Sequence, residues 1–142
     1  MTVWILDTDH VSLLERGNSK IRQRLRVTDP KLVMITIVTA EEQMKGRLAV
    51  INRLAGIERV ERLAAAYGDL QSTIEDLKRL TILPFSQGAC DRYRGLLGQK
   101  LRVGSHDLRI AAIALGVGGT VVTRNRRDFE RVPELMIEDW TV

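Results

Sequence analysis

Short segments rich in β-branched and apolar residues alternate along this chain with longer segments of helical periodicity, and that alternation sets the fold class. Strands are predicted at residues 2–6, 32–38, 80–83 and 120–123, with a further edge strand at 135–137. Strands that alternate with helices form a parallel sheet covered by helices on both faces. The chain is therefore predicted to be an α/β protein.

The helical segments carry their own start and stop signals. Helices are predicted up to residue 16, over residues 20–27, 39–55, 57–77 and 86–101, and from residue 105, with a helical turn at 126–131. Expected N-caps are Thr8 or Asp9, Thr39 and Ser105. Glu42 stands three residues after Thr39, which is the spacing of a capping box.

The helices at 39–55 and 57–77 are separated by Gly56 and resemble a helical hairpin. Each carries a stripe of apolar residues at steps of three and four. Two interpretations remain open: both stripes face the core of the domain, or part of the stripe pairs with a second subunit.

The length of the chain predicts a single domain, residues 1–142. Because 44% of its residues are hydrophobic, this domain can bury a hydrophobic core. No apolar run approaches the roughly 20 residues of a transmembrane helix, and no signal peptide is recognisable. The single Cys90 cannot form an internal disulfide, which favours a reducing cytoplasm. The formal charge is +4, with 22 basic and 18 acidic residues, and arginine is well suited to phosphate recognition.

Four acids that lie far apart in the sequence stand at the ends of apolar segments: Asp7, Glu42, Asp107 and Asp128. The carboxyl ends of parallel strands share one edge of the sheet, where ligands bind. Four carboxylates at one edge repel one another unless a hard cation lies among them. The pattern therefore predicts a Mg²⁺ or Mn²⁺ site, and a divalent ion held by acids is suited to hydrolysing phosphodiesters.

Each acid also has an ordinary structural interpretation. Asp7 is placed to cap a helix, while Glu41, Glu42 and Asp107 are placed to compensate a helix dipole. Glu41 and Glu42 point about 100° apart on a helix, so only one of them can face the site. Asp9 is a candidate supporting residue.

The two histidines, His10 and His106, are candidates for metal binding or acid–base chemistry, against a structural or surface role.

The segment 123–129 concentrates further polar groups. Asn125 and Asp128 are candidate groups on the metal side, and Thr123 is placed to bind a phosphate or orient an acid. The arginines of this segment, Arg124, Arg126 and Arg127, are candidates for holding a nucleic-acid backbone. The alternative is an ordinary solvated loop.

Four motifs, in the order in which they occur along the chain, resemble those of the PIN-domain ribonucleases. Within that family they resemble the VapC-type toxins of bacterial toxin–antitoxin pairs. The motifs are Leu6-Asp7-Thr8-Asp9, Ala40-Glu41-Glu42-Gln43-Met44-Lys45-Gly46, His106-Asp107-Leu108-Arg109-Ile110-Ala111-Ala112 and Thr123-Arg124-Asn125-Arg126-Arg127-Asp128-Phe129. Glu42 is preferred to Glu41 because the glutamate of that family usually stands four residues before a glycine, here Gly46.

The resemblance implies a three-layer α/β/α sandwich with a central, mainly parallel sheet. It implies Mg²⁺- or Mn²⁺-dependent cleavage of RNA that leaves a 5′-phosphate, with Asp7, Glu42, Asp107 and Asp128 as catalytic metal ligands. It also implies a homodimer and an antitoxin protein that covers the active site. The first helices and the hairpin at residues 46–78 are the candidates for the antitoxin groove.

The chain departs from the family pattern at two positions. Asp9 stands where the family often has asparagine, which adds negative charge near the site. Asn125 stands where many members have aspartate, so that Asp128 is chosen as the fourth acid and Asn125 is kept as its polar supporter.

Two other functions compete with the nuclease. The segment from Val3 to Val11 fits the nucleophile loop of haloacid-dehalogenase-like phosphatases, where Asp7 would form an aspartyl-phosphate. The other alternative is a non-catalytic module that binds nucleic acid or an antitoxin, with its acids acting only as caps.

Overall fold

A parallel sheet of five strands, in the order β3-β2-β1-β4-β5, lies at the centre of the computed structural model, which describes residues 1–142. All four strand pairings are parallel. The strands are β1 (Trp4–Leu6), β2 (Val33–Thr36), β3 (Thr81–Leu83), β4 (Thr120–Val122) and β5 (Met136–Glu138). All five predicted strands are present, and the last of them is the edge strand that the sequence predicts.

The helices follow the strands in the predicted α/β alternation. They are α1 (Thr8–Glu15), α2 (Ser19–Arg26), α3 (Ile37–Arg53), α4 (Leu63–Lys78), α5 (Gln87–Gly98), α6 (Ser105–Val117) and α7 (Arg126–Phe129), with 3₁₀ turns at Pro30–Leu32 and Ile57–Arg62. No helix is long and apolar enough to cross a membrane.

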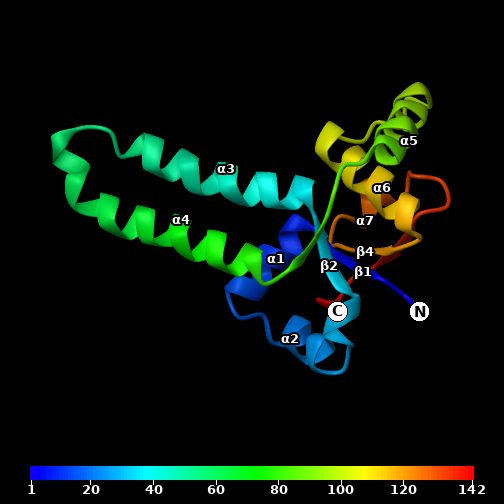
Figure 1. Cartoon of the computed structure of the whole chain (residues 1–142), viewed down its shortest axis with the longest axis horizontal. Coiled ribbons are helices and arrows are strands. Elements are labelled where there is room, and N and C mark those ends of the chain that lie inside the picture. Colours follow the sequence, from blue (N-terminus) through cyan, green and yellow to red (C-terminus); the bar gives the residue numbers. More distant parts are fainter.

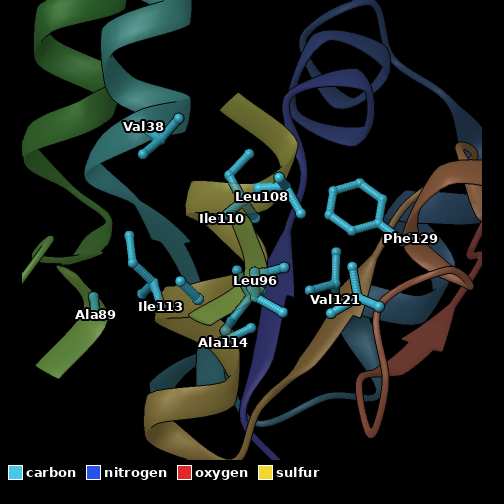
Figure 2. Close-up of a cluster of buried hydrophobic side chains, with 13 residues drawn as sticks. Val38, Ala89, Leu96, Leu108, Ile110, Ile113, Ala114, Val121 and Phe129 are labelled. Carbon is cyan, nitrogen blue, oxygen red and sulfur yellow. The ribbon is translucent and has the colours of Figure 1, made fainter. Parts of the chain in front are cut away.

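Successive residues of the inner strands point to opposite faces of the sheet and build two cores. On one face, Ile5 and Val121 pack against α5, α6 and Phe129 of α7 (Figure 2). On the other face, Leu6 and Val122 pack against α1 and α2. The sheet is therefore covered on both sides, as in the predicted three-layer sandwich. The helix α6 is buried along most of its length, as its apolar sequence predicts.

The predicted caps are displaced by one or more residues. Asp7, and not Thr8 or Asp9, caps α1 by accepting the Thr8 N–H. Gly104, and not Ser105, stands at the N-cap of α6, where no side chain caps the helix. In both places the helix begins earlier than the predicted caps indicate, and at α1 the reason is that Asp7, directly after β1, already provides a carboxylate for the first N–H of the helix.

The helix α3 begins at Ile37, inside the segment predicted to be a strand, and the Thr36 hydroxyl accepts the Thr39 N–H. The predicted cap at Thr39 and its capping box with Glu42 are therefore wrong. The sequence is ambiguous here because β-branched residues run without a break from the strand into the first turn of the helix. Glu42 consequently lies in the second turn, beyond the first-turn region where a carboxylate compensates the helix dipole.

The helices α3 and α4 form the predicted hairpin, which projects away from the body of the molecule (Figure 1). The interpretation that both apolar stripes face the core is wrong for the outer part of the hairpin. Ile57 is 88% exposed and Tyr67 is 55% exposed, and only residues near the base, such as Ala40 and Leu77, join the core. Amphipathic helices require an apolar partner, and here α3 and α4 partly cover each other.

The C-terminal segment packs back onto the sheet through Trp140, which is 1% exposed. Its ring lies 5.5 Å from that of Trp4, and the Arg24 guanidinium lies 5.0 Å from its centroid. The indole N–H donates to Glu138, which also forms an ion pair with Arg24. The end of the chain is thus fastened to α2 and β1.

Candidate functional site

The candidate acids gather at the carboxyl edge of the sheet, around the point where its strand order reverses. Strands β2 and β3 follow β1 on one side of the sheet, and the chain then crosses back so that β4 pairs with the other side of β1. Such a reversal opens a crevice between the two loops that leave the central strands. Asp7 follows β1 and Thr123 follows β4, so both lie at this crevice.

Asp7 is buried, with 5% of its surface exposed, and is held from three directions. Its backbone N–H donates to the Val122 carbonyl at 2.9 Å. Its Oδ1 accepts the Thr8 N–H at 2.8 Å, and its Oδ2 accepts the Thr123 hydroxyl at 2.9 Å. Asp7 is therefore both a helix cap and a fixed carboxylate at the crevice, so its two interpretations from the sequence are compatible.

Glu42 reaches the same crevice from α3. The Thr8 hydroxyl donates to Glu42 Oε1 at 2.8 Å, which ties the start of α1 to α3. Glu41, its neighbour, is largely exposed and lies 3.5 Å from His106 Nε2. The structure thus separates the two glutamates in the way that the helical angle predicts.

Asp107 and Asp128 are brought together by Asn125. The Asn125 side-chain amide donates to Asp107 Oδ2 at 3.2 Å and to Asp128 Oδ2 at 3.1 Å. The Asn125 backbone N–H donates to the Thr123 hydroxyl oxygen at 2.9 Å, which fixes the loop after β4. Asn125 therefore holds two carboxylates from different helices, α6 and α7, side by side.

Asp9 lies behind Asp7 and is fixed by the fully buried His10. His10 Nε2 must accept a hydrogen, because its partner at 3.1 Å is the Trp140 backbone N–H. The proton of the neutral ring therefore sits on Nδ1, which donates to Asp9 Oδ1 at 2.7 Å. Asp9 Oδ2 in turn accepts the Arg124 N–H at 3.2 Å. His10 is a buried structural link rather than a group on the acid cluster.

The three arginines after β4 are all exposed at the rim of the site. Arg126 forms an ion pair with Glu130 at 3.1 Å within its own helix. Arg124 and Arg127 form no side-chain ion pair within 4.0 Å. The segment is thus neither fully paired nor buried, and its guanidinium groups are accessible to a ligand.

Two acids of the cluster have raised pKa values, first because they are buried and then because other carboxylates lie nearby. Burial raises the pKa of Asp7 to about 7, with a further contribution from the charge of Asp9, although the bonds from Thr123 and Thr8 oppose the shift. Burial also raises the pKa of Asp107, to which the charges of Glu42 and Asp128 add. A raised pKa means that the ionised carboxylates are insufficiently compensated by positive groups within the chain.

The donor set fits a hard divalent cation in its chemistry, since it consists of carboxylate oxygens that repel one another and an amide that bridges two of them. No three acidic, histidine or cysteine side chains are close enough together to hold an ion in the present arrangement. Coordination therefore requires side-chain rotation, for which the half-buried position of Asp128 leaves room.

Thr8 was expected only as a helix cap, and its bond to Glu42 was not predicted. Its position relative to α3 depends on how α1 packs across β2, and no local spacing reports a pair 34 residues apart. The polar positions Thr8, Ser12 and Glu15 recur at helical steps on one side of α1, which is a signal that sequence reasoning did not use.

The comparisons with known proteins agree with the geometry. No protein-family model matches the chain. The chain is 31% identical to ribonuclease VapC of Rickettsia bellii, over 94% of this chain and 92% of that protein. Its fold is similar to that of VapBC2 from Rickettsia felis bound to a promoter DNA fragment, with 26% identity, a TM-score of 0.73 and coverage of 98% and 99%.

A toxin–antitoxin complex from Klebsiella pneumoniae also has a similar fold, with 25% identity, a TM-score of 0.67 and coverage of 93% and 94%. The similarity extends over nearly the full length of both partners in each of these comparisons. The chain belongs to the VapC family of endoribonuclease toxins.

Proposed function

We propose that this protein hydrolyses RNA phosphodiester bonds at the carboxyl edge of its sheet, with a Mg²⁺ or Mn²⁺ ion as cofactor. The observation that carries the proposal is the meeting of acids from four separate elements at the reversal of the strand order. Membership of the VapC family favours this nuclease over the phosphatase and the binding-module alternatives.

The groups that would hold the ion are Asp7, Glu42, Asp107 and Asp128. When bound, a divalent ion lowers the pKa of a coordinated water and polarises the scissile phosphate. The raised pKa of Asp107, caused by burial and then by Glu42 and Asp128, supports this assignment, because a cation relieves the same repulsion.

The remaining groups of the site position these acids. Thr123 fixes the rotamer of Asp7, and Thr8 fixes that of Glu42. Asn125 keeps Asp107 and Asp128 at one place. In this proposal, Asp7 orients the attacking water, because its carboxylate is the most firmly held of the four.

Arg124, Arg126 and Arg127 would hold the RNA backbone as it crosses the acids. Their exposure at the rim of the site supports this role, and a guanidinium can bind two phosphate oxygens at once. We also propose a cytoplasmic location, where the proposed RNA substrate is found.

We also propose an antitoxin as the protein partner. The R. felis structure holds a VapBC pair, and the K. pneumoniae structure is a toxin–antitoxin complex. The exposed apolar residues on the outer part of the α3–α4 hairpin, among them Ile57, Val60 and Tyr67, are a suitable contact surface for it or for the second subunit of a homodimer.

The test is cleavage of a pool of structured RNAs by purified, antitoxin-free protein in Mg²⁺, in Mn²⁺ and in EDTA. Discrete cuts that need the metal and disappear in the Asp107→Asn variant support the proposal. Asp69→Asn, an exposed change on α4, is the matched control and should cut like the parent. Equal cutting in EDTA, or full activity of the folded Asp107→Asn protein, contradicts it.

A further inference from the structure

A cavity of about 490 Å³ lies between α1 and α3 and opens directly beside the acid site. Two of its lining residues, Thr8 and Glu42, also belong to the acid cluster. Its volume falls within the range of roughly 300–1,000 Å³ that small-ligand sites occupy. The cavity is therefore large enough to take part of a ligand that is already bound at the acids.

The cavity is lined by polar and charged residues and one glycine, and none of its eight lining residues is hydrophobic. Gln43, only 9% exposed, donates from its side-chain amide to the Ser12 hydroxyl at 3.2 Å. The Gln43 carbonyl oxygen and the Ser12 hydroxyl hydrogen form no side-chain bond with the rest of the chain, so both are available to a ligand. Such groups recognise the edge of a nucleobase.

Two arginines line the outer part of this cavity. Arg47 is fixed on both sides: its Nε donates to the buried Thr73 hydroxyl at 2.9 Å, and its Nη2 lies 3.5 Å from Glu15. Arg16 is exposed and has no ion pair within 4.0 Å. Burial raises the pKa of Glu15, as does the charge of Asp76, although Arg47 and Arg16 oppose the shift. Two acids, Glu15 and Glu42, and two arginines line the cavity, and Arg16, which forms no ion pair within 4.0 Å, is the arginine available to a phosphate.

Gly46 keeps the wall of the cavity open. It lies in the middle of α3, where glycine destabilises a helix relative to alanine. A Cβ at this position would meet no atom within 4 Å, and its φ is not positive. Neither packing nor backbone conformation therefore requires a glycine at this position. A glycine at this position does keep the cavity open to a ligand, because a side chain here would enter the cavity.

We propose that the cavity between α1 and α3 is a subsite for the nucleotide next to the scissile phosphate of the RNA, with the neighbouring phosphate at Arg16 and Arg47 and the base edge at Gln43 and Ser12. This inference rests on the proposed nuclease function and adds to it a determinant of RNA binding. The RNA would extend from the arginines after β4, across the acids, into this subsite.

The lining favours RNA over a segment of a protein partner. A docked helix or strand of a protein usually buries hydrophobic side chains against its partner, and no hydrophobic residue lines this cavity. The guanidinium groups of Arg16 and Arg47 suit phosphates, and the paired polar groups of Gln43 and Ser12 suit base edges. An antitoxin segment in the cavity is the competing outcome of the experiments below.

The first experiment compares Gly46→Leu with Gly68→Leu. Gly68 also lies within a helix with no atom within 4 Å of a built Cβ, but it is outside the cavity. Both changes replace glycine by a good helix former, and so both should raise the melting temperature by about 2–4 °C. Only Gly46→Leu should weaken binding of a fluorescein-labelled, random-sequence single-stranded RNA 12-mer, measured in EDTA, by about tenfold or more.

The second experiment measures the salt dependence of that binding for Arg16→Gln. Loss of one phosphate contact should lower the slope of log Kd against log salt by about 0.7. A change in fold alone would not produce this specific decrease. Arg53→Gln removes the same charge at the end of α3, away from the cavity, and should leave the slope unchanged.

The outcomes separate this inference from the proposed function. A parent protein that cuts RNA, with unchanged affinity and slope in Gly46→Leu and Arg16→Gln, overturns the subsite alone. A parent that binds the 12-mer through the cavity but cuts no RNA overturns the nuclease and leaves the subsite standing. Absence of RNA binding by the parent overturns the subsite as well. Normal RNA binding by Gly46→Leu, combined with weaker inhibition by a co-expressed antitoxin, assigns the cavity to the protein partner.

Discussion

Thr123 donates its hydroxyl hydrogen to Asp7 Oδ2 at 2.9 Å and thereby joins two residues 116 positions apart in the chain. The bond crosses the gap between the ends of β1 and β4, and it is fully buried. The orientation of Asp7 therefore depends on the pairing of the first strand with the fourth.

Thr123→Val should impair RNA cleavage without unfolding the protein. Valine has nearly the same shape but cannot donate to Asp7, nor accept the Asn125 N–H. Loss of such an outer partner of a metal ligand typically lowers metal affinity or activity about 10–100-fold. The measurement is metal-dependent cleavage at several Mg²⁺ concentrations. Thr123→Ser keeps the hydroxyl and should retain most activity; equal loss in both variants would contradict this role.

The metal-free protein should become less stable as the pH rises from about 4 to about 7. Burial, followed by the charge of Asp9, raises the pKa of Asp7 to about 7, against an unfolded value of about 4. Between these values the folded state binds a proton that the unfolded chain has released, so the free energy of unfolding falls with pH. Urea unfolding in EDTA should show this fall, and Asp7→Asn should reduce it.

Mg²⁺ and Mn²⁺ should raise the melting temperature, and should do so more at pH 8 than at pH 5. The ion binds ionised carboxylates, and the pKa values of Asp7 and Asp107 are both raised by burial and neighbouring charge. At low pH the ion has to displace protons, which weakens its binding. Thermal unfolding with and without the ions checks this. In the Asp107→Asn protein, a stabilisation as large as that of the parent would count against the assigned ligands.

Trp140→Ala should destabilise the fold by about 3–5 kcal/mol, the usual range for truncating a buried aromatic residue. The change removes the packing on Trp4, the contact with Arg24 and the indole bond to Glu138. Urea denaturation gives the free energy of unfolding. Val142→Ala, at a 90% exposed position two residues further on, is the control and should have little effect.

Replacing Ile57 and Val60 by serine should change the free energy of unfolding by no more than about 0.5 kcal/mol per residue, since both are largely exposed at the end of the hairpin. The same double variant should associate more weakly with a protein partner. Urea unfolding and light scattering, alone and with a co-purified antitoxin, measure the two effects. A large loss of stability would mean that these residues pack within the monomer.

The sequence predicts the order of strands and helices well, because burial of short parallel strands requires continuous apolar segments such as Val121–Val122, and α6 is apolar around most of its circumference. It predicts the start of α3 poorly. Ile37 and Val38 have the side chains of a strand, but the Thr36 hydroxyl caps a helix there. Local propensity cannot decide between two conformations that the same β-branched residues allow.

At the site, the acids could be found from their positions after apolar segments, since topology alone brings such positions together. The residues that hold these acids in place could not be identified in the same way. The Thr8 bond to Glu42 and the His10 bond to Trp140 depend on side-chain directions across packed elements. A groove at the first helices and the hairpin is expected from the resemblance, but the residues that line the cavity beside Gly46 could not be listed from the sequence, because α2 and β2 separate its two walls in the chain.

The central place of β1 also bears on when the toxin can first act. During synthesis, β1 emerges early, but one of its two partners is β4, and Asp107 and Asp128 come late in the chain. A partly synthesised chain that lacks β4 and the residues after it therefore cannot complete the acid cluster. The site can thus form only after β4 has paired with β1, so assembly of the sheet comes before any activity at the acids.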